Sequence, residues 1–141
     1  MKLYIDKNLD IDKTKQNLVA EFCIFCADML PIEGDFKIYV VSERKPYQID
    51  TTAAYILNEN CCYIYGKNRA VPDVMRSIAH EMTHMMQDQT GLINGPIRDA
   101  GGFHEDQANS RAGELIKLFA KSKPERKKIY ESKSKLNLSI L

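Results

Sequence analysis

The chain has 141 residues, a length that suits one domain with a sizeable core. Its hydrophobic fraction of 44% and its charged fraction of 28% are ordinary for a globular protein. Its net charge of +1 excludes a general attraction of the whole molecule for nucleic acid or for an anionic membrane.

The amino-terminal segment, MKLYIDKNLDIDKTKQ, lacks the apolar core of a signal peptide. No run in the chain approaches the roughly 20 apolar residues that a membrane helix needs. Four cysteines without a secretion signal indicate a reducing compartment, so the sequence predicts a cytoplasmic protein.

The first half of the chain predicts one helix followed by strands. Residues 12–30 are predicted as a helix, because apolar side chains recur at steps of three and four: Leu18, Val19, Phe22, Cys23, Cys26 and Met29. Residues 36–41, FKIYVV, are rich in β-branched and aromatic side chains and predict a strand. Residues 52–57 and 61–66 predict two more strands, and the short Asn-Glu-Asn loop between them predicts a hairpin.

The second half predicts two helices. One begins at Pro72-Asp73, where proline suits the first turn and an acid faces the positive end of the helix dipole, and it ends at Gly91. The other spans 103–120, with an inward face of Ala108, Ala112, Leu115, Ile116 and Phe119. We therefore expect an α+β domain over residues 1–120, with a small, mostly antiparallel sheet of about three strands.

Residues 121–141 form a basic carboxy-terminal tail, with seven Lys or Arg and two Glu. We expect this tail to be helical or partly disordered. It could contact nucleic acid or an acidic partner, although a solvated chain end is the simpler interpretation.

The stretch IAHEMTHMMQ, residues 78–87, lies in the middle of the first of these two helices and holds two of the three histidines. Residues four apart share a helix face, so His80 and His84 can direct two imidazoles at one metal ion. Glu81 is turned about 100° from His80, which places its carboxylate beside the metal as a general base. This is the His-Glu-x-x-His pattern of zinc hydrolases. The histidines have apolar neighbours, which predicts burial on more than one face: Ile78, Ala79, Met82, Met85 and Met86.

A catalytic zinc takes three protein ligands and one water, so a third ligand is required. Gln87 and Thr90 stand where the elongated zinc-peptidase pattern has Gly and His, which excludes that group. Glu105 lies on the inward face of the last predicted helix, where an acid is costly unless it is paired or bound to metal. Asn109, one turn later, could accept a hydrogen bond from the outer nitrogen of a ligand histidine.

Other residues near Glu105 stay open as alternatives. His104 could stabilise the oxyanion of a tetrahedral intermediate, act as a rival third ligand, or simply lie at the rim. Asp106 could replace Glu105, although it points about 100° away. Asp99 resembles the third-ligand aspartate of another zinc-peptidase type, but Pro96 replaces the Thr of that pattern.

The cysteines favour a structural role. Cys23 and Cys26 have CxxC spacing, but they lie within an apolar helical segment without a Gly or Pro turn. Cys61 and Cys62 are adjacent on a predicted strand and face opposite sides, so both cannot join one site. A zinc site with four cysteines is therefore not expected.

The second helix reads Glu105-Asp106-Gln107-Ala108-Asn109-Ser110-Arg111-Ala112. Together with the His-Glu-x-x-His helix, it resembles the ImmA/IrrE family of small zinc peptidases, many of them from phages and mobile elements, whose second helix has the form E-x-x-A-N-x-x-A. The resemblance covers roughly residues 35–120 and extends to the thermolysin-like group, which has a Glu as third ligand. It implies a minimal zincin-like fold and one Zn²⁺ held by His80, His84 and Glu105. Arg111 departs from the family, which usually has Phe there.

From these residues we expect a metallopeptidase that acts on a protein or peptide, with zinc-bound water activated by Glu81. One alternative is a binding or regulatory module of a phage or mobile element, with the zincin fold and weak or no hydrolysis. Another is a non-peptidase domain in which the histidines are structural. Several tyrosines could line a substrate groove, although sheet packing is their more common role: Tyr39, Tyr47, Tyr55, Tyr63 and Tyr65. An edge strand could also pair with an extended peptide.

Overall fold

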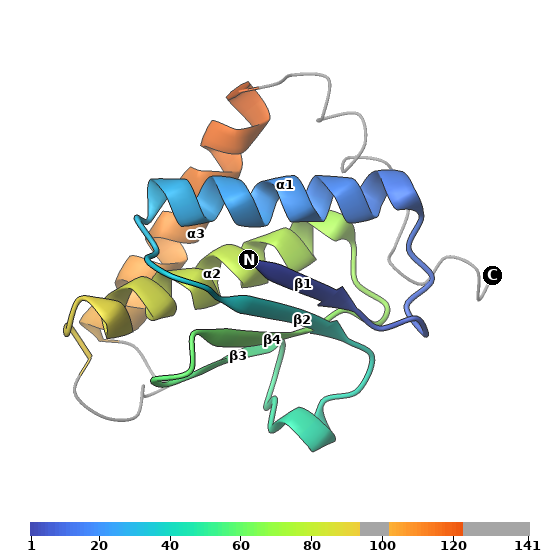
Figure 1. The fold of residues 1–141 in the computed structure, drawn as a ribbon, viewed down its shortest axis with the longest axis horizontal. Coiled ribbons are helices and arrows are strands. Elements are labelled where there is room, and N and C mark those ends of the chain that lie inside the picture. Colours follow the sequence, from blue (N-terminus) through green and yellow to red (C-terminus); the bar gives the residue numbers. More distant parts are fainter. Residues whose placement is uncertain (94–101, 123–141) are drawn as a thin grey trace.

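The computed structural model describes residues 1–93 and 102–122 of the chain, and this part contains three α-helices and a four-stranded sheet (Figure 1). The elements in chain order are β1 (Lys2–Ile5), α1 (Lys13–Met29), β2 (Lys37–Val41), the 3-10 turn η1 (Lys45–Tyr47), β3 (Ala53–Ile56), β4 (Cys61–Tyr65), α2 (Val71–Gln89) and α3 (Phe103–Ser122). The expected α+β class is confirmed. No helix of the described part is long and apolar enough to cross a membrane.

The strand order is β1-β2-β4-β3, and two of the three pairings are parallel. β1 and β2 run parallel because α1 connects them, and a helix is the usual connection of a parallel pair. The hairpin of β3 and β4 supplies the antiparallel pair, as predicted. The expectation of about three, mostly antiparallel strands is wrong. β1 was not predicted from the sequence, and the parallel pairing of β2 with β4 depends on contacts between segments that no local pattern predicts.

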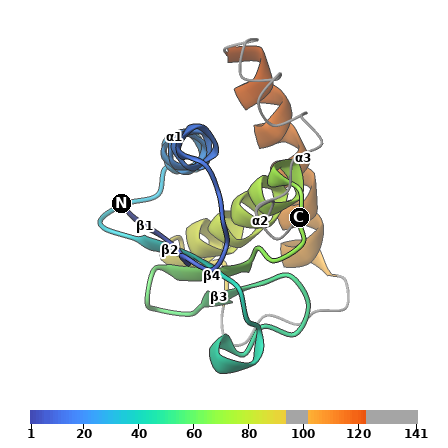
Figure 2. The same ribbon diagram turned by 90° about the vertical axis from the view of Figure 1, so that its right-hand side faces the viewer.

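The helices α1 and α2 cover one face of the sheet, and α3 packs mainly against α2 (Figure 2). The side chains that meet between these layers form one apolar core, which includes Phe22, Ile38, Val40, Cys62, Ile64, Met75, Ile78 and Met82. The predicted inward face of α1 is confirmed except at its end. Met29 is 37% exposed and Leu30, which is 2% exposed, takes the buried place instead.

The ends of α2 follow the signals in the sequence. Pro72 and Asp73 lie in its first turn, and Gly91 follows its last turn with a φ of +76°, a conformation that glycine adopts without strain. Asp88 then ties the last turn to the hairpin, because its Oδ2 accepts from the Tyr55 hydroxyl at 2.6 Å and from the Asn58 amide at 2.7 Å. The helix that carries the two histidines is therefore fixed against β3.

The helix α3 is joined to the rest of the core by aromatic and polar contacts. The Phe119 ring meets the rings of Phe22 and Phe25 edge to face, with centroids 5.1 and 5.3 Å apart. Arg111 pairs with Glu114 and donates to the Met29 carbonyl at the end of α1. The tail from residue 123 onward and the alternative ligand Asp99 lie outside the described residues.

The sheet face away from the helices carries a row of stacked tyrosines. Tyr4, Tyr39, Tyr63 and Tyr47 follow one another across β1, β2, β4 and η1, with successive ring centroids 4.7, 5.0 and 4.9 Å apart. Three of the five tyrosines considered for a substrate groove, Tyr39, Tyr47 and Tyr63, therefore belong to this stack.

Candidate metal centre

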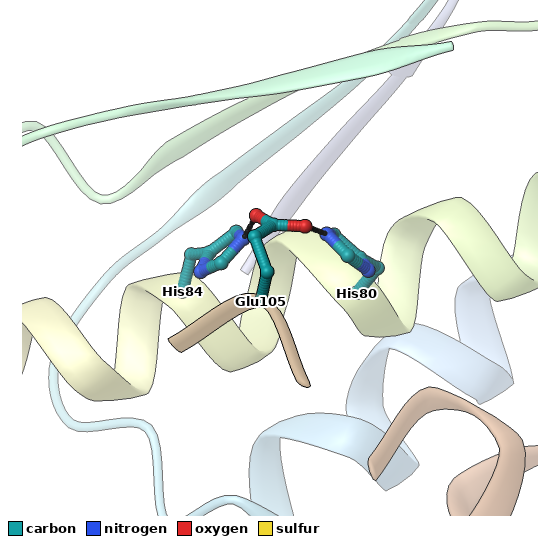
Figure 3. Close-up of side chains that lie close together, drawn as sticks. All are labelled: His80, His84 and Glu105. Carbon is teal, nitrogen blue, oxygen red and sulfur yellow. Dashed lines mark hydrogen bonds and ion pairs between the residues drawn. The ribbon is translucent and has the colours of Figure 1, made fainter. Parts of the chain in front are cut away.

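His80 and His84 lie one turn apart on α2, and Glu105 reaches them from the first turn of α3 (Figure 3). The Nε2 atom of His84 is 2.7 Å from Glu105 Oε1, and that of His80 is 3.2 Å from Glu105 Oε2. Within residues 1–93 and 102–122, this is the one group of His, Cys, Asp or Glu that could hold a metal ion, with ligand atoms within 4.8 Å of one another. The structure brings together the three ligands predicted from the sequence.

The close packing of α3 on α2 sets this geometry. Ala108 and Ala112 are fully buried, and their small side chains let the two helices approach closely. Glu105 lies one turn before Ala108 and its side chain is 17% exposed, and its carboxylate lies between the imidazoles of His80 and His84 (Figure 3). The His80 and His84 rings are nearly perpendicular, with centroids 4.9 Å apart.

Gln87 holds His84 in place from the side opposite Glu105. Its Oε1 is 2.8 Å from His84 Nδ1, and its Nε2 donates to the His104 carbonyl and to Gln107 Oε1. Because an amide oxygen only accepts, His84 Nδ1 carries a proton, and Nε2 is the nitrogen that faces Glu105. Such a second hydrogen bond fixes the tautomer of a ligand histidine. This role was not predicted from the sequence, although Gln87 lies three residues after His84 on the same helix face.

His80 is held in the form that binds metal. Burial lowers its pKa, and the nearby His84 ring acts in the same direction, while Glu105 and a hydrogen bond with Asn109 oppose the shift. The net shift is downward, so the neutral imidazole is favoured, and only the neutral form is a ligand. The predicted partnership of Asn109 with a ligand histidine agrees with this contact.

The three side chains line a cleft of about 920 Å³ that runs between α2 and β3. Glu81 also lines this cleft, and at 8% exposed it is nearly buried. The β3 wall contributes Ala53, Ala54, Tyr55 and Ile56, so Tyr55 is the one predicted groove tyrosine that lines this cleft among the described residues.

Two of the other predicted candidates lie away from the ligand atoms. The His104 ring is 2.7 Å from the Leu92 carbonyl through Nε2, and neither His104 nor Asp106 lines the cleft. His104 contributes its backbone carbonyl to the Gln87 contacts instead. The four cysteines are free and buried, in keeping with the structural role predicted for them.

The residues fit a zinc ion. Two imidazoles and one carboxylate are a donor set of catalytic zinc sites, which keep a further position for water. Donors about 2.0–2.1 Å from a tetrahedral ion stand about 3.3 Å apart. The 3.2 Å between His80 Nε2 and Glu105 Oε2 is close to this value. The 2.7 Å between His84 Nε2 and Glu105 Oε1 is shorter, so these two atoms would have to move apart to hold the ion. The tautomer of His84 and the lowered pKa of His80 leave both imidazoles ready to bind.

Comparison of the chain with protein-family models, with curated proteins and with solved structures finds no match in any of the three searches. The resemblance to the ImmA/IrrE family therefore stays a prediction from the motif residues.

Proposed function

We propose that this protein is a zinc-dependent metallopeptidase that hydrolyses peptide bonds of a protein or peptide substrate. The observation that carries this proposal is the convergence of His80, His84 and Glu105 in a cleft that Glu81 also lines. A site that only stabilised the fold would need neither the cleft nor an acid next to the first ligand.

Bound Zn²⁺ would act as a Lewis acid that polarises the peptide carbonyl and makes water more acidic. The carboxylate of Glu81 takes a proton from the attacking water and passes it to the leaving nitrogen. Gln87 keeps His84 in the required tautomer, and Asn109 contacts His80 from α3. Glu81 thus transfers the proton, whereas Gln87 and Asn109 position the two histidines.

The edge strand β3 supports a peptide substrate. β3 is the last strand of the sheet and forms one wall of the cleft, whereas β1, at the other edge, does not line it. An extended peptide can add to such an edge through backbone hydrogen bonds, with its carbonyl groups facing the metal ligands across the cleft. Of the two edges of the described sheet, β3 is therefore the one that suits a substrate.

Substitution of Glu81 by Gln tests the proposal. We expect the purified variant to keep one zinc per chain by elemental analysis, while hydrolysis of a peptide library falls by about 100-fold or more, because general bases contribute about 10²–10⁴. His84→Ala should lose both zinc and activity. Glu59→Gln, at an exposed acid outside the cleft, is the matched control and should keep both.

The outcomes separate the alternatives. A near wild-type rate for Glu81→Gln would exclude Glu81 as the base. Purified protein without zinc would overturn the metal site, and zinc-loaded protein that cleaves no peptide would favour a binding module.

A further inference from the structure

Two arginines line the cleft on the side of the first turns of α2, and neither forms an ion pair with a carboxylate within residues 1–93 and 102–122. They are Arg69, just before α2, and Arg76, one turn before His80. The proposed chemistry uses neither of them. Four carboxylates line the same cleft, those of Asp50, Asp73, Glu81 and Glu105, so local contacts rather than net charge decide what binds beside the arginines.

Arg69 is fixed in place by neutral acceptors. Its Nη1 donates to the Tyr65 carbonyl at 2.6 Å, and its Nη2 donates to the Asp73 carbonyl at 2.9 Å and to Ser77 Oγ at 2.7 Å. These three bonds use three of the five guanidinium donors. Burial lowers the pKa of Arg69, with the Asp73 carboxylate opposing the shift. A partly buried cation held by neutral groups is stabilised further by a carboxylate.

Arg76 is more exposed and has no hydrogen bond or ion pair with the described part of the chain. Its guanidinium lies beside Gly113 of α3, where a Cβ atom would stand 3.8 Å from Nη1. This contact places the guanidinium of Arg76 beside α3 at the cleft. Arg76 therefore presents a positively charged hydrogen-bond donor to the cleft that no group in the described part of the chain accepts from.

The direction of a bound peptide follows from β3. The start of β3 lies near the first turns of α2, because the Thr52 carbonyl accepts from the Tyr65 amide and Tyr65 is bonded to Arg69. Its end lies near the last turn of α2, through the contacts of Asp88. β3 and α2 thus run in the same direction. A peptide that adds antiparallel to β3 places the residues after the cleaved bond toward Arg76.

We propose that Arg69 and Arg76 form a carboxylate-binding subsite for the substrate residues that follow the cleaved bond. The ligand is an acidic side chain or the carboxy-terminal carboxylate of the peptide. The four residues from Arg76 to His80 span about 6 Å of helix, which an extended peptide covers in about two residues. The subsite therefore contacts the first or second substrate residue after the cleaved bond. This inference rests on the proposed peptidase function.

The test uses zinc-loaded full-length protein and a randomised peptide library made in two forms, with a free and with an amidated carboxy terminus. Wild type should favour Asp or Glu at the first or second position after the cleaved bond, or should cut near a free carboxy terminus and not near an amidated one. The first result identifies a side chain as the ligand, and the second identifies the terminal carboxylate.

Arg76→Gln should reduce this preference by at least about tenfold, the value of a hydrogen bond to a charged group, and Arg76→Glu should favour Lys or Arg at the same position. Lys117→Gln removes an exposed charge of α3 that does not line the cleft, and it should leave the profile unchanged. Equal zinc content in all variants shows that the metal centre is intact.

A profile that is the same in wild type, Arg76→Gln and Arg76→Glu would overturn the subsite and leave the peptidase standing. A preference for Lys or Arg in the wild type would also overturn it and would point to Asp50 and Asp73. If neither the wild type nor any variant cleaves a peptide, the proposed function fails. The subsite is then tested by measuring which library peptides the zinc-loaded protein binds. The subsite is supported if the wild type binds peptides with the carboxylate preferentially and Arg76→Glu does not. It is overturned if the two proteins bind the same peptides equally.

Discussion

The side-chain amide of Gln87 joins the two helices that carry the proposed metal ligands. Its oxygen faces the Nδ1–H of His84 on its own helix, and its nitrogen faces two acceptors of α3, the His104 carbonyl and Gln107 Oε1. Only an amide suits both ends, because a carboxylate at this position would repel the two acceptors. One fully buried residue therefore fixes a histidine tautomer and the separation of the helices.

Gln87→Met keeps the shape of this side chain but removes its hydrogen bonds. We expect zinc affinity to fall by about 10–100-fold, as is typical when the partner of a ligand histidine is lost. A competition titration with a chromophoric chelator measures the change. Gln89→Met, in the same helix but bonded to Glu33 and Asn60, is the control and should bind zinc like the wild type. Equal affinities for the two variants would show that Gln87 has no part in the site.

Among the elements, α2 and β3 form the walls of the cleft, and Asp88 holds their ends together. An acid in the last turn of a helix is unfavourable next to the negative end of the helix dipole. Here the cost is offset by the bonds from the Tyr55 hydroxyl and the Asn58 amide. Burial raises the pKa of Tyr55, and the bond to Asp88 adds to the shift, so the hydroxyl stays protonated and continues to donate.

Asp88→Ala should destabilise the fold by about 1–3 kcal/mol, because two donors lose a charged acceptor. Urea unfolding followed by circular dichroism measures this difference. Asp28→Ala, at an exposed acid of α1, should change the free energy of unfolding by less than about 0.5 kcal/mol. If both variants are equally stable, the two bonds of Asp88 contribute nothing to the fold.

At the scale of the whole molecule, three of the four buried thiols lower the free energy of unfolding at alkaline pH. Burial raises the pKa of Cys23 to about 12, and it also raises the pKa of Cys26 and of Cys62. In the unfolded chain a thiol loses its proton near pH 8.5. Above that pH the unfolded chain binds fewer protons than the folded one, so the free energy of unfolding falls as pH rises toward 12.

We expect each such thiol to cost about 2 kcal/mol of stability at pH 10 relative to pH 7. Cys23→Ala removes one of these groups, so its free energy of unfolding should fall less between pH 7 and pH 10 than that of the wild type. Urea midpoints at both values give the comparison, and the groups that titrate in both proteins cancel. Parallel pH profiles would mean that the Cys23 thiol does not resist ionisation in the folded protein.

The sequence predicted the parts of the molecule that depend on local pattern. The spacing of His80 and His84 and the inward face that includes Glu105 depend on helix geometry alone, and the structure brings these residues together. The order of the strands depends on contacts far apart in the chain, and the short β1 gave no pattern from which to infer them. The role of Gln87 depends on acceptors of α3, and the position of Arg76 in the cleft depends on the packing of that helix.

The proposed third ligand lies on α3, so a metal held by all three residues would bind the folded state alone. A segment corresponding to α2 holds two of the three donors, and the third follows His84 by 21 positions. The complete set exists only when the helices have packed, so zinc at 100 times its dissociation constant would add about 2.7 kcal/mol to the stability of the fold. With the proposed zinc site, the supply of metal in the surroundings would change the stability of the fold as well as the activity.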